Sequence, residues 1–238
     1  MTAGFSFSQE LKEKVDLTVS ALAEKKFKVD PIAGENFSRL PSIVGSMQKR
    51  HGLIIESAIL EAVGNLPNYT VWQVPAFHIS QDVIAAVSSA NNVKNNPDWI
   101  HLLNNSYPYT EENSAKTIQV DMVAFNRSTK DVVAMEIKRG YSTHDGGKKK
   151  AILKDVLSIQ MLLKSYAENK TGEIIGSTKS LVCSYYSSRE FNDLISVDRH
   201  DLDNLFGSEI CLYVEQVNQY YQEKIQKLLG DLTAQAIS

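Results

Sequence analysis

The sequence predicts an α/β fold with a central mixed β-sheet flanked by helices. Two observations support this class. Apolar residues recur three and four positions apart in several segments, as in helices that cover a sheet. Between these segments lie runs of β-branched and aromatic residues at 71–79, 117–140 and 181–186, which are typical of strands. At 238 residues and 43% hydrophobic, the chain can bury one substantial core, so we expect a single domain over 1–238.

Two helices are expected before the first strand. Apolar residues at helical spacing within 9–26 predict an amphipathic first helix. Pro31 and Pro41 interrupt the chain after it, and Ser42 is the expected N-cap of a second helix over 42–64. This second helix has a broad apolar face, as an element that covers a sheet requires.

The segment at about 81–116 is expected to be an insertion between two core strands. It is rich in asparagine and carries Trp99, Tyr107 and Tyr109. Asparagine amides bond adenine edges, and aromatic rings stack on exposed bases. The segment is therefore either an element that reads bases or a solvated loop.

Alternating elements are expected to complete the fold after the central hairpin. A helix is predicted over about 150–169 and a strand over 181–186, followed by a polar loop at about 187–203. The apolar run at 210–214 predicts a further strand, and a closing helix is expected over about 217–229.

The most informative segment is the hairpin at 117–140, because it carries charged residues on otherwise apolar strands. Side chains alternate along a strand, so Glu136 and Lys138 project to one face while Met135 and Ile137 project to the other. A charged pair on an apolar strand needs a partner or a function.

Symmetric pairing about a Ser128–Thr129 turn places Asp121 opposite Glu136. Two carboxylates in this position repel each other, and a divalent cation would offset the repulsion because hard cations take carboxylate oxygens as ligands. The backbone carbonyl of Ile137 is a further candidate ligand. The alternative interpretation is a surface hairpin with a cross-strand ion pair.

The order of Asp121, a turn and Glu136-x-Lys138 resembles the core motif of the PD-(D/E)XK nucleases, the restriction-endonuclease-like superfamily. The resemblance implies an αβββαβ core over about 42–186, with an N-terminal helix, the insertion and a C-terminal helix added to it. As a sequence motif it covers only the hairpin. Val120 occupies the position directly before Asp121, where the motif that names the family has a proline.

The resemblance implies catalytic roles for the hairpin residues. Asp121 and Glu136 would hold Mg²⁺ or Mn²⁺, and Lys138 would orient or deprotonate the attacking water or neutralise charge on the phosphate. A third acid, Glu56 or Glu61, is expected on the second helix. Glu56 is favoured because it has apolar neighbours, and a carboxylate on an apolar flank is costly unless it is paired or metal-bound.

Several residues after the motif are candidates for contacting nucleic acid: Arg139, Tyr141, His144, Lys148, Lys149, Lys150 and Gln160. The lysines follow a glycine pair at the expected start of a helix, where both the helix N-terminus and the ammonium groups attract phosphate. A solvated charge run fits the same pattern. Gln160 is followed by Lys164, which departs from the Gln-x-x-x-Tyr of one exonuclease-like branch of the family.

Composition restricts the other functional classes. The formal net charge of −3 gives no global basic field, so any contact with nucleic acid requires a local basic surface. Cys183 and Cys211 offer neither a disulfide framework nor zinc-ligand spacing. No apolar run approaches the ~20 residues of a membrane span, and the N-terminus lacks the pattern of a signal peptide. We therefore expect a cytoplasmic protein without membrane contact.

These features together predict a Mg²⁺-dependent endodeoxyribonuclease that hydrolyses DNA phosphodiester bonds. A type II restriction endonuclease is the particular form that the resemblance implies, and symmetric cutting of a duplex would favour a homodimer. One alternative is a repair or recombination nuclease that acts on ends or branched DNA. The other is a binding module that keeps the fold but has lost turnover.

Overall fold

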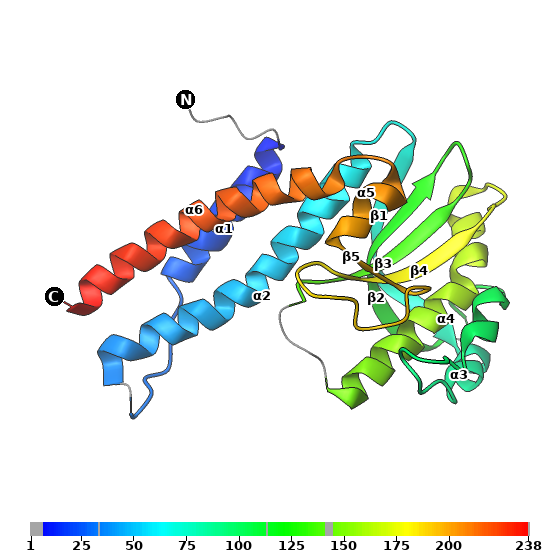
Figure 1. The fold of residues 1–238 in the computed structure, drawn as a ribbon, viewed down its shortest axis with the longest axis horizontal. Coiled ribbons are helices and arrows are strands. Elements are labelled where there is room, and N and C mark those ends of the chain that lie inside the picture. Colours follow the sequence, from blue (N-terminus) through cyan, green and yellow to red (C-terminus); the bar gives the residue numbers. More distant parts are fainter. Residues whose placement is uncertain (1–6, 33, 113, 141–144, 238) are drawn as a thin grey trace. The chain divides into compact units, whose positions relative to one another are not determined.

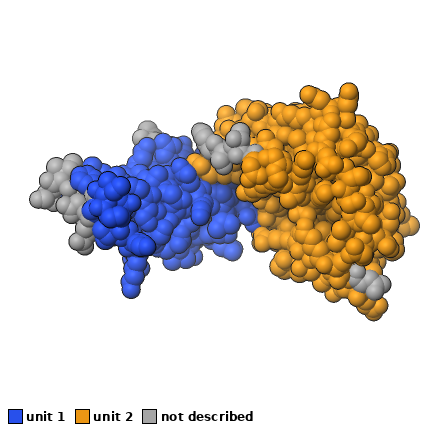
Figure 2. All heavy atoms as spheres, turned by 90° about the horizontal axis from the view of Figure 1, so that it is seen from below, with its two compact units in different colours: residues 1–62, 209–238 blue, residues 63–208 orange. Residues whose placement is uncertain are grey.

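The chain forms two compact units, shown in different colours in Figure 2. The first consists of 1–62 and 209–238, and the second of 63–208. A single domain was expected, and the division falls inside the helix that precedes the first strand. The computed structural model describes these residues: 7–32, 34–112, 114–140 and 145–237.

The first unit is built from α1 (Gln9–Ala23), most of α2 (Gly34–Gly64) and α6 (Ile210–Ile237), seen in Figure 1. α1 packs against α6. An ion pair of 2.8 Å between the Asp16 carboxylate and the Lys224 ammonium joins these two helices. The amphipathic first helix is thus present where its apolar pattern predicts it.

α2 is longer than the sequence predicts. It begins at Gly34 and contains Pro41, so the expected break at this proline and the expected cap at Ser42 are wrong. The fixed φ of proline is compatible with a helix, and the cost is one missing N–H donor and a local distortion. The apolar face of the surrounding helix outweighs that loss.

The predicted strand at 210–214 is also wrong, because α6 begins at Ile210 and continues without a break. Ile210, Val214 and Val217 are buried at helical spacing, whereas Leu212 is 53% exposed. A short apolar run cannot be assigned to strand or helix from its own periodicity. The burial of every third or fourth residue settles the assignment.

The second unit contains a five-stranded mixed sheet in the order β1-β2-β3-β4-β5 (Figure 1). β1 pairs with β2, and β2 with β3, in antiparallel fashion, while β3–β4 and β4–β5 are parallel. This confirms the expected α/β class. The strands are β1 (Tyr69–Ser80), β2 (Ser114–Asn126), β3 (Val132–Lys138), β4 (Thr178–Ser184) and β5 (Ser196–Asp198).

The helix α4 (Gly146–Thr171) connects β3 to β4 and covers one face of the sheet (Figure 1). Its buried residues, among them Leu153 and Leu157, share a core with Val132 and Ala134 of β3. Because side chains alternate along a strand, Glu136 and Lys138 continue the face of β3 that packs on α4. Glu136 and Lys138 thus follow the buried apolar residues Val132 and Ala134 along the same face of β3.

The insertion at 81–116 is neither a solvated loop nor an exposed array of aromatic rings. It forms α3 (Gln81–Val87) and the 3₁₀-helix η1 (Ile100–Asn104), and both pack on α4. Trp99 is 1% exposed and belongs to the core of the second unit. This ring is therefore unavailable for stacking on a base.

Tyr109 also has a structural role, because its ring lies 5.1 Å from that of Phe77 and 5.0 Å from that of Tyr166. The asparagines serve the local backbone: the side-chain amide of Asn92 donates to the carbonyl of Asn96 at 3.1 Å. Asn92, Trp99 and Tyr109 thus have structural roles within the insertion.

The expected polar loop after β4 contains β5 and the helix α5 (Arg199–Phe206). Asp198 caps α5, and the Asp201 carboxylate accepts from the backbone N–H of Asp198 in return. A three-residue strand and a two-turn helix are too short to give a periodic signal. In the parts of the chain that the structure describes, no helix has the length and apolar character needed to cross a membrane.

Candidate active site

The pairing of β2 with β3 ends next to the charged residues. Met122 faces Met135 and Phe125 faces Val132, which is the register that a symmetric turn predicts. Beyond Met122 and Met135 both strands continue, but with other partners. β2 pairs with β1, where Val120 faces Val74, and β3 pairs with β4 as far as its last residue.

A β-bulge lies at the same point of β2. Between the pairs Trp72–Val123 and Val74–Val120, β2 contains one residue more than β1. Val120 and Val123 both belong to the core, so the extra residue lies in the Asp121–Met122 step. Bulges redirect side chains, and this one turns the Asp121 carboxylate toward β3.

At this point the Asp121 side chain, rather than the backbone of β2, provides the hydrogen-bond acceptor for β3. Its Oδ2 accepts a hydrogen bond of 2.8 Å from the backbone N–H of Ile137. Asp121 is only 7% exposed, so this bond satisfies a carboxylate that would otherwise be costly to bury. The acid is fixed at the end of the paired segment, beside Glu136.

Glu136 and Lys138 form an ion pair on the α4 face of β3, where the Lys138 ammonium donates to Oε1 of Glu136. Their side chains are 24% and 31% exposed, respectively, so the pair is only partly solvated. Burial raises the pKa of the Glu136 carboxyl above its ordinary value. The Lys138 charge opposes this rise, and the Asp121 carboxylate adds to it.

This donor set fits a hard divalent cation. Asp121 and Glu136 supply two carboxylates whose mutual repulsion a cation would remove, and the Ile137 carbonyl lies between them in the chain. Among the described residues, no group of three or more His, Cys, Asp or Glu side chains is placed to hold a metal. Waters and a substrate phosphate would have to complete the coordination, as is usual for Mg²⁺.

Of the two acids considered on α2, Glu61 has other partners within the first unit. Its carboxylate accepts from the backbone N–H of Ser8 at 2.9 Å and from the Ser8 hydroxyl at 2.6 Å. It also accepts from the hydroxyl of Tyr213. Glu61 thus ties α1, α2 and α6 together. Glu56 is half-buried on the same helix, and its role as third acid stays a prediction.

Gln160 uses its side-chain amide inside the second unit. Its Nε2 donates to the carbonyls of Leu103 and Thr178 at 3.3 and 3.2 Å, and its Oε1 accepts from the N–H of Ser180 at 2.7 Å. These bonds join α4 to β4 and to η1. Gln160 therefore has a structural role in this protein. These hydrogen bonds within the unit do not support the contact with DNA that the sequence predicts for Gln160.

The three lysines expected to grip phosphate lie in the first turn of α4. The Asp145 carboxylate caps this helix by accepting from the N–H of Lys148 at 2.8 Å. Lys148 and Lys150 are exposed and Lys149 is half-buried. Arg139 directly follows the motif lysine. Tyr141 and His144, which were also named as candidates, lie outside the described residues.

The sheet also brings two residues to the site that the sequence pattern did not indicate. Lys138 pairs with Ser184 of β4, and Ser184 pairs with Asp198 of β5. Directly paired residues project to the same face, so Lys138, Ser184 and Asp198 form a row across the last positions of three parallel strands. The only local signal was a polar residue at the end of each apolar run.

Comparison with known proteins found no matching family model, no matching curated protein and no matching solved structure. The geometry of the site must therefore carry the functional argument.

Proposed function

We propose that this protein is a Mg²⁺-dependent endodeoxyribonuclease of the PD-(D/E)XK type. The observation that carries the proposal is the gathering of Asp121, Glu136 and Lys138 where β2 and β3 stop pairing. Two adjacent carboxylates and a lysine at such a point are the groups that metal-assisted phosphodiester hydrolysis requires.

The chain's own groups have distinct roles in this proposal. Asp121 and Glu136 would hold the cation, which would polarise the phosphate and activate the attacking water. Lys138, which contacts Glu136 in this structure, would place its ammonium beside the developing negative charge on the phosphate.

The connectivity of the elements supports the same proposal. A helix, three antiparallel strands, the helix α4 and the parallel strand β4 follow one another in the order that the PD-(D/E)XK resemblance implies. The exposed lysines at the start of α4 belong to the same unit as the motif, and they provide the local basic surface that the net charge of −3 does not.

A cleavage assay on defined substrates tests the proposal. Supercoiled plasmid, linear duplex, circular single-stranded DNA and RNA would each be incubated with the protein and Mg²⁺, and with EDTA in parallel. We expect Mg²⁺-dependent linearisation of the circular plasmid. Cleavage of linear DNA alone would point to an end-processing nuclease, and DNA binding without any cleavage to a binding module, and either result would contradict the proposal.

Mapping the ends of the products tests the finer proposal of restriction-type cutting. Cuts at a single recurring sequence on both strands, together with a dimer in solution, are expected for an enzyme that cuts a symmetric site with two copies of its active site. Cuts at unrelated positions would refute this form while leaving the phosphodiesterase proposal intact.

A further inference from the structure

A hollow of about 360 Å³ lies at the carboxyl ends of β4 and β5. It is lined by 185–188, directly after β4, and by 198–200, where β5 passes into α5. This edge of a parallel sheet is where open α/β folds commonly bind ligands. The seven lining residues are two tyrosines, two serines, an aspartate, an arginine and a histidine, so the hollow offers mainly hydrogen-bond donors.

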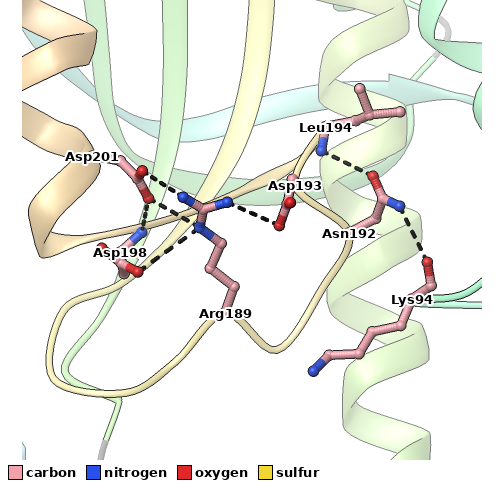
Figure 3. A network of polar contacts seen from close by, with 7 residues as sticks. All are labelled: Lys94, Arg189, Asn192, Asp193, Leu194, Asp198 and Asp201. Carbon is pink, nitrogen blue, oxygen red and sulfur yellow. Dashed lines mark hydrogen bonds and ion pairs between the residues drawn. The ribbon is translucent and has the colours of Figure 1, made fainter.

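The one acid among the lining residues is already engaged. An Asp198 oxygen accepts from the N–H of His200 at 2.9 Å, and another lies 3.8 Å from Nε of Arg189. Figure 3 shows the Arg189 guanidinium between Asp198, Asp193 and Asp201. Arg189 and the start of α5 offset part of the Asp198 charge, and Arg189 shares its own charge with Asp193 and Asp201.

The positive charge among the lining residues comes from Arg199. Nε of Arg199 donates to Nε2 of His200 at 3.2 Å, which sets the guanidinium beside the imidazole. Hydroxyls of Ser187 and Ser188 line the same space. A guanidinium with neighbouring hydroxyl donors is a common arrangement for recognising a phosphate.

The loop that lines the hollow is fastened to the strand that carries Lys138. The N–H of Tyr185 donates to the Lys138 carbonyl, and that of Tyr186 to the Arg139 carbonyl, both at 2.9 Å. Gly140 adopts φ +86, and a Cβ there would meet the Ser187 hydroxyl oxygen at 2.7 Å. Ser187 can therefore approach this closely only because residue 140 is a glycine.

The hollow and the motif lie along the same edge of the sheet. Lys138, Ser184 and Asp198 are successive members of one row, and neighbouring strands are ~4.8 Å apart. The row from β3 to β5 therefore spans roughly 10 Å, so the hollow lies within reach of the phosphates next to the bond that is cut.

We propose that this hollow binds a backbone phosphate of the nucleic-acid strand, close to the bond that is cut, through Arg199 and the hydroxyls of Ser187 and Ser188. The identity of the ligand as a nucleic-acid strand rests on the proposed function. The anion contact itself does not, because the side chains in the hollow define it independently of Asp121 and Glu136.

The test is a measurement of DNA binding by Arg199→Gln in EDTA, where no cleavage can occur. Fluorescence anisotropy with a labelled 20-base-pair duplex gives Kd at several salt concentrations. We expect Kd to rise about tenfold, as for the loss of one charged hydrogen bond. We also expect the slope of log K against log salt to fall by about 0.9, the value of one phosphate contact. Arg199→Lys should retain most of the slope.

Arg127→Gln is the matched control, because Arg127 follows β2 in the turn at the opposite end of β3 from Lys138 and donates to the Pro67 carbonyl. It should leave both quantities unchanged. If Arg199→Gln binds with the parent's Kd and slope, the proposal is overturned, whether or not the parent cleaves DNA. If the parent binds but never cleaves, and Arg199→Gln still loses the contact, the phosphate site stands and the proposed activity fails.

A second measurement on the unaltered protein does not depend on the folding of a variant. Titration with inorganic phosphate, followed by two-dimensional NMR, should shift the backbone amide signals of Ser187, Ser188 and His200. Chloride at equal ionic strength should not shift them. Phosphate titration that leaves these three signals in place would overturn the proposal.

Discussion

At the scale of single residues, the protonation of Glu136 affects both the stability of the fold and the proposed binding of a cation. Its pKa is raised in the folded protein by burial and by Asp121, despite the opposing charge of Lys138. A proton on this carboxyl therefore stabilises the fold. That contribution is complete below the unfolded value of 4.5 and is lost as the pH rises through the raised folded value.

Glu136→Gln should therefore be more stable than the parent at pH 8, because the amide carries no charge next to Asp121. Thermal unfolding without divalent cations checks this, and the difference should shrink as the pH falls to about 5. Mg²⁺ should stabilise the parent and not the variant. A variant less stable than the parent at pH 8 would show that the Lys138 contact outweighs burial and repulsion.

The two functions of Asp121 can be separated by two substitutions. Asp121→Asn keeps an oxygen that can accept from the Ile137 N–H, so the fold should lose little stability while cation binding is impaired. Asp121→Ala leaves that buried donor without a partner and should cost about 1–3 kcal/mol of unfolding free energy. Denaturant titration of both variants measures this, and equal stabilities would contradict a structural role for the carboxylate.

Gly140 links the motif strand to the loop after β4. Gly140→Ala combines a positive φ with an approach of 2.7 Å to the Ser187 hydroxyl, and a strained residue of this kind costs about 1–3 kcal/mol. We expect a lower melting temperature and weaker DNA binding. Gly230→Ala, where a Cβ would meet nothing within 4 Å and φ is not positive, is the control and should be neutral or stabilising.

At the scale of elements, the hairpin was predictable and the helix boundaries were not. The register that pairs Met122 with Met135 follows from the alternation of β2 and β3 about a short turn, which are both local properties. Local propensity predicts a helix break at Pro41 and a strand at 210–214. Burial against the rest of the fold determines the secondary structure at both places, and both are helical.

The connection between α4 and β4 depends on Gln160, whose amide bonds the backbone at Leu103, Thr178 and Ser180. Gln160→Leu removes these bonds inside the unit and should destabilise it by about 1–3 kcal/mol. Denaturant unfolding measures the loss. DNA affinity of the folded variant should equal that of the parent, and a large loss of affinity with unchanged stability would instead support the contact with DNA expected from the sequence.

At the scale of the whole molecule, no sequence feature marks the division into two units. The boundaries fall within α2 and just before α6, where there is neither a linker nor a change of composition. Because α2 continues past this boundary without a break, the helical periodicity of its sequence does not show where the first segment of the unit ends. Only long-range contacts reveal it.

In the candidate site too, some residues are brought together by local sequence and others only by long-range strand pairing. Asp121, Glu136 and Lys138 lie within one hairpin, so alternation and turn symmetry bring them together. Ser184 and Asp198 reach Lys138 only through the parallel pairing of β3, β4 and β5. That pairing depends on the crossover through α4, and no motif in the sequence specifies it.

We propose that the Asp121, Glu136 and Lys138 cluster catalyses metal-dependent hydrolysis of DNA. The most direct test is the rate of Mg²⁺-dependent plasmid cleavage by Glu136→Gln and Lys138→Ala. The control is Glu173→Gln, which alters an exposed acid paired with Lys130 at 3.1 Å in the same unit. We expect losses of about 100-fold or more for the two motif variants and an unchanged rate for the control. Motif variants that cleave as fast as the parent would contradict the claim.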